Sequence, residues 1–238
     1  MNIFKKKYEI SRLWLIIIVL IILAVISGIL CWKYDVKTIC GTIMGSLCAG
    51  IIVAIIQLII AYQDYQAMDK LKTLYLQDIM FDRDHRSLYA DIIKNINKDL
   101  DVMGVTALRF FEHFADLEAD AREEARVLLA ALDRGVRVRI LLPDKQFLPE
   151  DKYADIEKVK HISERIIERG NGKYSFNVRY FDHTPAHSIF RIDDECIIGP
   201  VFPEVSSKNT PALRLRNKSK FAIVYLKYFD SEWDKAHE

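Results

Sequence analysis

Two long runs of uncharged, mostly apolar residues near the start of the chain constrain its fold more than any other feature. Residues 13–32 form a run of 20, and residues 38–62 form a run of 25. A helix of about 20 apolar residues crosses the hydrocarbon core of a bilayer. The first run is too long for a signal peptide, and no small-residue cleavage site follows it. Because only residues 33–37 separate the runs, residues 1–62 are predicted to form a two-helix transmembrane hairpin.

The charges that flank these runs predict how the hairpin is oriented. The basic residues before the first run are Lys5, Lys6, Lys7 and Arg12, and those between the runs are Lys33 and Lys37. Cytoplasmic flanks of membrane helices carry the excess of lysine and arginine. We therefore expect a multi-pass protein of a bacterial inner (cell) membrane, with spans at about 13–32 and 38–62 and both termini in the cytoplasm.

Small and polar residues share one side of the second run. At about 100° per residue, one narrow helical sector holds Thr38, Thr42, Ser46 and Gln57, and a Gly41–Gly45 step lies on the adjoining edge. Small residues allow helix backbones to approach each other closely. Two interpretations remain open: packing within the hairpin or a dimer, or a weakly polar pore lining in a homo-oligomer without a charged filter.

The pattern remains helical for some distance after the second run. Apolar residues recur at spacings of three and four up to about residue 80, and no glycine or proline interrupts them. Residues 63–86 are therefore predicted to form a helical stalk that extends the second span into the cytoplasm.

Residues 87–238 alternate between strand and helix patterns, which predicts a layered α/β domain. Strands are expected at residues 100–107, 136–142, 174–181, 188–192, 196–198 and 212–216, and helices at residues 110–134, 155–169 and 220–235. Residues 193–195 are expected to turn a hairpin, and Ser219 is expected to cap the last helix.

Charge and cysteine content exclude several classes of protein. The formal net charge is +1, and residues 1–62 carry six basic and two acidic side chains, so residues 63–238 carry about −3. Such a domain does not coat DNA through broad phosphate neutralisation. The four cysteines are Cys31, Cys40, Cys48 and Cys196. Their spacing fits neither a disulfide framework nor a zinc module, and we expect no metal and no cofactor.

Three segments of the last 140 residues resemble the phospholipase D-like superfamily. Residues 130–144 read AALDRGVRVRILLPD, residues 187–199 read HSIFRIDDECIIG, and residues 228–233 read YFDSEW. The second segment is similar to that superfamily's HxK(x)4D motif. The resemblance implies a phospholipase D-like domain over residues 87–238, with a histidine that attacks a phosphodiester and a lysine that holds a phosphate oxygen.

The motif departs from the family pattern in ways that favour a non-catalytic copy. His187 occupies the histidine position, and the acidic position falls on Asp194, or on Asp193 if one residue is missing. Ile189 stands where the lysine belongs, and a proline instead of a serine follows Gly199. Without the lysine, the developing negative charge lacks its fixed cation. His187 is then either a phosphate contact or a hydrogen-bonded strand histidine, and an enzyme would need His187 and Asp194 as catalytic residues.

Other polar residues near the motif are candidates for phosphate binding. They are Arg191 within the motif, Ser206, Ser207 and Lys208 in a polar loop, and Arg214 and Arg216 in the last strand. Hydroxyl, ammonium and guanidinium groups donate to phosphate oxygens. The alternative interpretation is a solvated turn and a solvated strand face.

Together these features predict an oligomeric membrane effector. Its cytoplasmic domain would bind a phosphate-bearing small molecule or short oligonucleotide, and the oligomer would open a pore or disrupt the membrane. Its partners would be membrane lipid and further copies of itself. The two-span plan is similar to that of membrane effectors in bacterial anti-phage defence. The alternative functions are a membrane-tethered phosphodiesterase (nuclease or phospholipase), with His187 from two subunits in one site, and a scaffold without a ligand.

Overall fold

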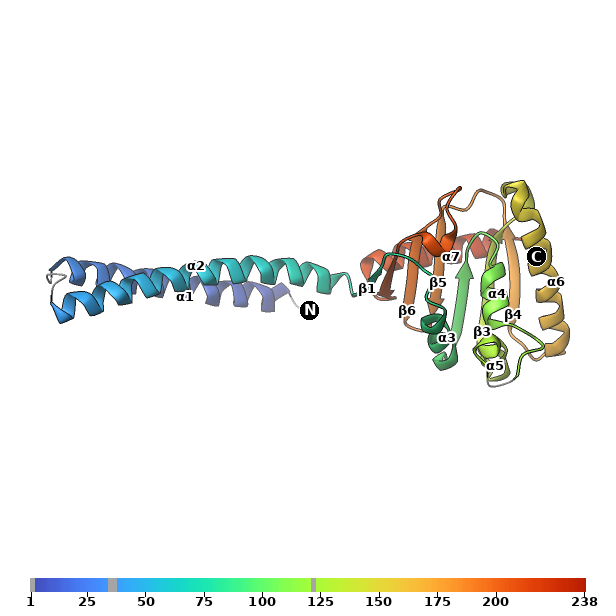
Figure 1. The fold of residues 1–238 in the computed structure, drawn as a ribbon, viewed down its shortest axis with the longest axis horizontal. Coiled ribbons are helices and arrows are strands. Elements are labelled where there is room, and N and C mark those ends of the chain that lie inside the picture. Colours follow the sequence, from blue (N-terminus) through green and yellow to red (C-terminus); the bar gives the residue numbers. More distant parts are fainter. Residues whose placement is uncertain (1–2, 34–37, 121–122) are drawn as a thin grey trace. The chain divides into compact units, whose positions relative to one another are not determined.

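The computed structural model describes residues 3–33, 38–120 and 123–238 of the chain. The chain divides into two compact units, Met1–Lys70 and Leu71–Glu238 (Figure 1).

The first unit consists of helix α1 (Ile3–Lys33) and most of helix α2 (Ile39–Thr73). The two helices run side by side (Figure 1), and the Cys48 Sγ lies 3.7 Å from the Ala24 carbonyl oxygen of α1, to which it donates. Residues 34–37 of the expected turn lie outside the described residues.

Within the described residues, one helix is long and apolar enough to cross a membrane. It is Ile39–Tyr65, with 27 residues and a mean hydropathy of 2.6, whereas Trp14–Leu30 is a shorter apolar helix. By length and composition the structure therefore supports one span. The two-span hairpin and the multi-pass topology are not confirmed.

The polar residues expected on one side of α2 are exposed in the single chain. Two of their hydroxyls hydrogen-bond within the helix: Thr42 Oγ1 donates to the Thr38 carbonyl oxygen at 3.2 Å, and Ser46 Oγ donates to that of Thr42 at 2.7 Å. Gln57 is exposed as well, whereas Gly41 is buried. The side of α2 that carries Gly41 is thus covered in the single chain, whereas the side that carries the polar residues is exposed.

The expected helical stalk over residues 63–86 was wrong beyond residue 73. Helix α2 ends at Thr73, and Leu76–Met80 form strand β1, which pairs antiparallel with strand β7 (Ala212–Arg216). Tyr75 adopts a positive φ of 51°, which a right-handed helix does not accommodate. The free edge of β7 supplies hydrogen-bond partners, so long-range pairing overrides the local helical pattern.

The second unit is built on a seven-stranded mixed sheet in the order β1-β7-β6-β5-β2-β3-β4. Strands β2, β3 and β4 are parallel, and the remaining neighbours are antiparallel. The other strands are β2 (Asp99–Met103), β3 (Arg137–Pro143), β4 (Phe176–Phe181), β5 (His187–Ile192) and β6 (Glu195–Pro200). This is the mixed α/β domain that the sequence predicts.

Helices cover both faces of the sheet. They are α3 (Arg86–Asn95), α4 (Leu108–Phe114), α5 (Val127–Asp133), α6 (Tyr153–Gly170) and α7 (Lys220–Lys235). Apolar residues of α3 to α6 pack with one set of strand side chains, among them Val102 and Phe190. Those of α7 pack with the alternate set, among them Met103 and Ile189. Successive strand residues point to opposite faces, so one face of the sheet is covered by α3 to α6, and the other, here called the α7 face, is covered by α7.

The single helix expected over residues 110–134 was also wrong. The chain instead forms α4 and α5, with a short 3₁₀ turn at Glu124–Arg126 before α5, and residues 121–122 lie outside the described residues. The Asp116 amide donates to the Ala125 carbonyl oxygen at 2.8 Å, so the chain folds back on itself. This break allows both Phe111 and Leu128 to reach the core, where they are at most 1% exposed.

Several local predictions were confirmed. Strands β5 and β6 form the expected hairpin, whose turn includes Asp193 at a positive φ of 37°. Ser219 caps α7, because its Oγ accepts a hydrogen bond from the Phe221 amide at 3.2 Å. These features depend on neighbouring residues, which is why the sequence alone predicts them.

Candidate functional site

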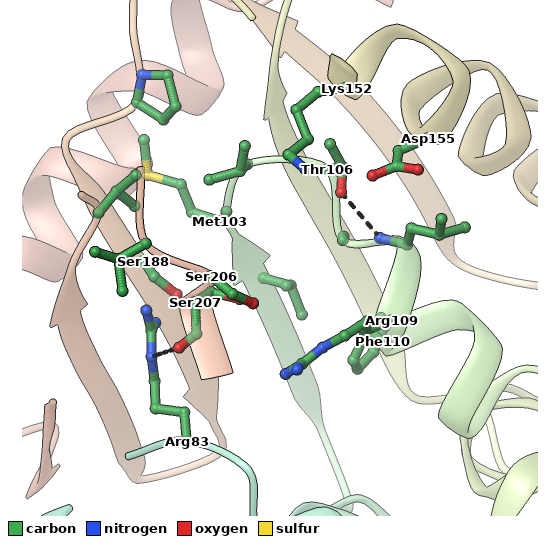
Figure 2. A pocket seen from close by; sticks show the side chains of 18 of the residues that line it. Arg83, Met103, Thr106, Arg109, Phe110, Lys152, Asp155, Ser188, Ser206 and Ser207 are labelled. Carbon is green, nitrogen blue, oxygen red and sulfur yellow. Dashed lines mark hydrogen bonds between the residues drawn. The ribbon is translucent and has the colours of Figure 1, made fainter. Parts of the chain in front are cut away.

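A cavity of about 870 Å³ lies where strand β2 ends (Figure 2). Its lining comes from five chain segments, within residues 83–89, 102–114, 147–155, 184–190 and 201–207. Strand β2 lies between the parallel strand β3 and the antiparallel strand β5. The connections therefore diverge at its carboxyl end, and ligands of open α/β sheets bind at such points.

The segment after β2 is shaped to leave this space open. Ala107 adopts a positive φ of 54° just before α4 begins. The Leu108 amide donates to Thr106 Oγ1 at 3.5 Å (Figure 2). The chain thus turns away from the sheet within a few residues of Met103. Strand β2 therefore ends at Met103, whereas the sequence predicted a strand over residues 100–107.

Arg83 is the most deeply buried charged residue of the cavity lining, with an exposed fraction of 8%. Its backbone amide donates to the Lys208 carbonyl oxygen at 2.7 Å. Its Nε donates to the Ser207 carbonyl oxygen at 2.9 Å, and its Nη2 donates to the Pro200 carbonyl oxygen at 3.3 Å. Its Nη2 also donates to Thr210 Oγ1. All four acceptors are neutral oxygens.

No carboxylate forms an ion pair with Arg83 in the part of the chain that the structure describes. Burial lowers the pKa of Arg83, and the nearby Arg109 lowers it further, although Tyr89 acts in the opposite direction. Burial raises the pKa of Tyr89 to about 12, so this phenol is neutral near pH 7 and supplies no counter-charge. Burying a cation without an anion beside it costs free energy, and a bound anion would offset that cost.

The cavity lining contains further charged residues of both signs. The cations are Arg86, Arg109 and Lys152, and the acids are Asp84, Asp151, Asp155 and Glu204. The Asp84 carboxylate lies 3.9 Å from the guanidinium of Arg109, and that of Asp151 lies 3.0 Å from the Lys152 ammonium. Both acids are more than half exposed, at 58% and 68%. In Figure 2, Arg109 reaches toward the space from the side opposite Arg83.

The remaining lining is largely aromatic and aliphatic, and it includes Tyr89, Phe110, Phe114, Phe147 and Phe202. Tyr89 and Phe190 meet edge to face with ring centroids 5.1 Å apart. His113 also lines the cavity, and burial and the neighbouring Arg86 and Arg109 lower its pKa. Apolar walls strengthen electrostatic attraction, so this site is suited to an organic anion.

The motif histidine is not part of the cavity lining. His187 packs on the α7 face, edge-on to the rings of Tyr225 and Tyr228 at centroid distances of 5.2 and 5.7 Å. Ile189 is fully buried beside the apolar residues of α7. Both Ile189 and the preceding Ser188 line the cavity, although successive residues of β5 point to opposite faces of the sheet.

Among the other predicted phosphate ligands, Ser206 and Ser207 line the cavity. Lys208 follows them with an exposed side chain. Arg191 lies on the α7 face, where it contacts Asp101 and forms an ion pair with Asp230 at 3.3 Å.

The arginines of β7 face the turn between β5 and β6. Arg214 donates to Glu195 Oε2 at 2.9 and 2.7 Å. Arg216 lies 2.9 Å from an oxygen of Asp194. The carboxylate of Asp193 accepts backbone N–H bonds from residues 97–99. These charges are therefore paired with one another or with the backbone.

No metal centre emerges from the described residues, and the thiol of Cys196 is poorly suited to reaction. No group of three or more His, Cys, Asp or Glu side chains in them could hold a metal ion. Cys196 is buried, and burial raises the pKa of its thiol to about 12, so the reactive thiolate is scarce at neutral pH.

The sequence analysis did not identify Arg83, the buried charged residue of the cavity lining. Arg83 falls within the expected stalk, and only the charged run Asp82-Arg83-Asp84-His85-Arg86 marks its position. That run is typical of any solvated turn, so no local signal separates Arg83 from its neighbours.

Comparison with solved structures finds distant similarities of fold. One is TrmBL2, described as an archaeal chromatin protein that binds DNA (14% identity, 79% of this chain, 70% of that chain, TM-score 0.45). Another is Nuc from Salmonella typhimurium, a phospholipase D family member (16% identity, 64% of this chain, 88% of that chain, TM-score 0.42). A third is NucT from Helicobacter pylori (13% identity, 65% of this chain, 90% of that chain, TM-score 0.40).

No family model matches the chain, and no curated protein matches its sequence. Because the TM-scores lie below 0.5, the similar structures say nothing about the chemistry of this cavity. What the site can do follows from its own residues.

Proposed function

We propose that this protein is a membrane effector whose α/β domain binds a phosphate-bearing small molecule in the cavity beside Arg83. The observation that carries the proposal is a buried guanidinium that lines the cavity and has neutral acceptors only, within the described residues. A phosphate oxygen placed there would supply the missing negative charge. Charge-assisted hydrogen bonds from arginine to phosphate are about twice as strong as neutral ones.

The size and walls of the cavity favour a nucleotide-sized ligand. Ligand cavities span roughly 300–1,000 Å³, and the volume here is about 870 Å³. Aromatic side chains such as Phe110 and Phe147 could stack with a base, while Arg83 and Arg109 hold the phosphate. A short oligonucleotide of one or two residues would fit the same chemistry, because each unit carries both a base and a phosphate.

The membrane part of the proposal rests on the apolar surface of α1 and α2. Large apolar side chains of both helices are exposed, among them Ile18, Ile22, Ile52 and Ile56. We propose that both helices span an inner membrane with the α/β domain in the cytoplasm, and that several copies assemble. Thr38, Thr42, Ser46 and Gln57 would then line a weakly polar path. Ligand binding must favour one state of the assembly over another to change that path. A role in anti-phage defence belongs to the same proposal.

Binding is favoured over phosphodiester cleavage by the surroundings of His187. Its ring lies against two tyrosines on the α7 face, and Ile189 occupies the position where a lysine would hold phosphate. A histidine without a neighbouring fixed cation lacks the electrostatic stabilisation that phosphoryl transfer needs. Hydrolysis of bis(p-nitrophenyl) phosphate by the wild-type chain, abolished by His187→Ala, would establish the alternative function instead.

The test uses the full chain in liposomes with an entrapped fluorescent dye. Binding of ATP and of the dinucleotide pApA is measured by calorimetry on the same protein in micelles, with pyrophosphate as a competitor. We expect at least one probe to bind and to release dye. Arg109→Gln, which changes a partly exposed side chain, should weaken binding by about tenfold, the value of one charge-assisted hydrogen bond.

Arg137→Gln is the matched control. Arg137 forms an ion pair with Asp99 at 2.8 Å, about half exposed, and it does not line the cavity. This variant should bind as the wild type does. Equal binding by the wild type and Arg109→Gln, or no binding of any probe including pyrophosphate, would contradict the proposed ligand site. Binding without dye release would contradict the pore.

A further inference from the structure

One residue holds both ends of the loop that forms a wall of the cavity. Arg83 Nη2 donates to the carbonyl oxygen of Pro200, just before the loop, at 3.3 Å. Its Nε and backbone amide donate to the carbonyl oxygens of Ser207 and Lys208, where the loop ends, at 2.9 and 2.7 Å. Residues 201–207 therefore form a loop, here called the 201–207 loop, whose two ends share one guanidinium.

Thr210 completes this arrangement. Its Oγ1 accepts from Arg83 Nη2 and donates to the Ser207 carbonyl oxygen at 2.9 Å, and the residue is 1% exposed. Gly199 leaves no spare room nearby. A Cβ there would lie 2.6 Å from the Pro211 carbonyl oxygen and 3.4 Å from Arg83 Nη1. The guanidinium thus sits in a closely packed niche, and its displacement would move the loop ends.

Between these fixed ends, the loop carries apolar side chains that are partly exposed. Phe202 is 46% exposed and Val205 is 44% exposed, although both line the cavity. The Val205 amide donates to the Phe202 carbonyl oxygen at 3.2 Å, so the loop contains a tight turn of its own. Closing on a ligand would bury this apolar surface, which is favourable in water.

Arg83 also lies close in sequence to the membrane helix. It follows the last residue of β1, Met80, by three positions, and β1 begins three positions after α2 ends at Thr73. Strand β1 is at the edge of the sheet, and among the described strands it pairs with β7 alone, with an irregularity between Leu76 and Asp78. An edge strand with one neighbour is easier to shift than a central strand.

We propose that Arg83 is a positioning residue that couples the 201–207 loop to β1, so that closure of the loop on a bound anion shifts the strand that leads into α2. This inference rests on the proposed function for its ligand, whereas the connection between the loop and β1 does not depend on that function. The coupling passes through Arg83 and Thr210, because these two side chains join the segment after β1 to both ends of the loop.

The test is amide hydrogen exchange on the full chain in micelles, read by mass spectrometry, first without any ligand. Thr210→Val keeps the shape of the side chain but removes one of the three acceptors of the Arg83 guanidinium. We expect exchange to become roughly tenfold faster in both the 201–207 loop and Leu76–Met80, the effect of one hydrogen bond to a charged group. Thr210→Ser, which restores the hydroxyl, should return both segments toward the wild-type rate.

Thr106→Val is the matched control, because Thr106 lines the same cavity but has no hydrogen bond to Arg83. It should leave the exchange of Leu76–Met80 unchanged. Faster exchange in the loop alone, with β1 unaffected in Thr210→Val, would overturn the coupling.

A second measurement adds ATP, and in a parallel sample pyrophosphate, to the wild type and to Thr210→Val. In the wild type, ATP should slow exchange in the loop and change it in Leu76–Met80, whereas in Thr210→Val the change in β1 should be lost. If ATP protects the loop but leaves β1 identical in the wild type, the coupling is wrong and the ligand site stands. If ATP and pyrophosphate protect nothing, the proposed function fails, and the experiment without ligand still decides the coupling.

Discussion

Arg83, which is buried, and Arg139, whose side chain is 12% exposed, differ in what balances their charge. On the α7 face, Arg139 of β3 donates to Asp101 at 2.7 and 3.0 Å and to Asp230 at 2.8 Å. Its guanidinium also lies over the rings of Phe229 and Trp233. At the cavity, Arg83 donates only to neutral oxygens among the described residues.

The surroundings change the two pKa values in opposite directions. Burial by itself would lower the pKa of Arg139, but the hydrogen bonds and charges of Asp101 and Asp230 outweigh it and raise that pKa. Burial and Arg109 lower the pKa of Arg83. Arg139 is therefore paired with acids of the fold itself, whereas Arg83 donates only to neutral oxygens among the described residues. The missing acid, and not burial alone, is the observation on which the proposed anion site rests.

The largest effect is expected from removing the acid between the paired arginines. Asp101 is fully buried and contacts both Arg139 and Arg191. Asp101→Asn should lower the free energy of unfolding by about 3–5 kcal/mol, because it removes the fully buried one of the two carboxylates that pair with Arg139 and Arg191 and leaves only the half-exposed Asp230. Urea unfolding of the full chain in micelles measures it. Asp99→Asn, in the exposed pair with Arg137, should change it by less than about 1 kcal/mol. A small effect of Asp101→Asn would mean that Arg139 and Arg191 do not need their buried acid, and the comparison with Arg83 would lose its basis.

A smaller loss is expected when the unpaired arginine itself is replaced. Arg83→Met removes a buried charge along with its hydrogen bonds, so the free energy of unfolding should fall by about 2 kcal/mol at most. Arg139→Met removes one of the two arginines that pair with Asp101, so it should lower the free energy of unfolding more than Arg83→Met does. Pyrophosphate should stabilise the wild type against urea but not Arg83→Met. Equal losses in the two variants without pyrophosphate would show that Arg83 is as fully compensated as Arg139.

A third change tests whether Tyr89 is a hidden anion beside Arg83. Burial raises the pKa of Tyr89 to about 12 from 10.0, so the folded state keeps the neutral phenol where the unfolded state ionises. Stability from this group is complete below pH 10 and is lost as the pH rises through the folded value. Tyr89→Phe should change the free energy of unfolding by less than about 1 kcal/mol at pH 7 and should remove the decline above pH 10. A large loss at pH 7 would indicate that the phenolate neutralises Arg83.

The smallest effect concerns His183, next to the cavity-lining Thr184 and in contact with α7. Burial opposes its protonation, but hydrogen bonds to the Thr184 carbonyl and to Glu232, at 2.8 Å, outweigh it and raise the pKa of His183 above 6.5. This stabilisation is therefore complete below pH 6.5 and is lost as the pH rises through the folded pKa. His183→Gln should lower the free energy of unfolding by about 0.5 kcal/mol at pH 5.5, as for a partly exposed pair, and by less at pH 8. Urea titrations at both values measure the difference, and an equal loss at both would contradict the assignment.

How far the sequence predicts the structure depends on the range of each interaction. The hairpin of β5 and β6, strand β7 and the Ser219 cap were predicted because each is specified within a few neighbouring residues. The strand β1 was not, because its partner β7 is distant in sequence and Tyr75 leaves the helical region only in the folded chain. The broken α4–α5 segment failed for a similar reason: its helical pattern is continuous, but packing of Phe111 and Leu128 divides it.

The candidate site shows the same division. The sequence placed Ser206 and Ser207 near a phosphate-binding site, and both line the cavity, but their role remains a prediction. It also grouped His187 and Arg191 with them, and the pleat of β5 turns those two side chains toward α7. Which side chains surround a strand residue depends on the helices that cover each face of the sheet, and a motif does not contain that information.

By itself, then, the sequence determined the apolar helices, the α/β alternation and most of the strands, because hydrophobic periodicity and capping are local and repeat along the chain. The tertiary structure alone decided which arginine lacks an acid. Arg83 and Thr210 stand 127 positions apart, and Arg139 and Asp230 stand 91 apart. Compensation of a buried charge depends on distances of a few ångströms between such remote residues, and no local pattern encodes those distances.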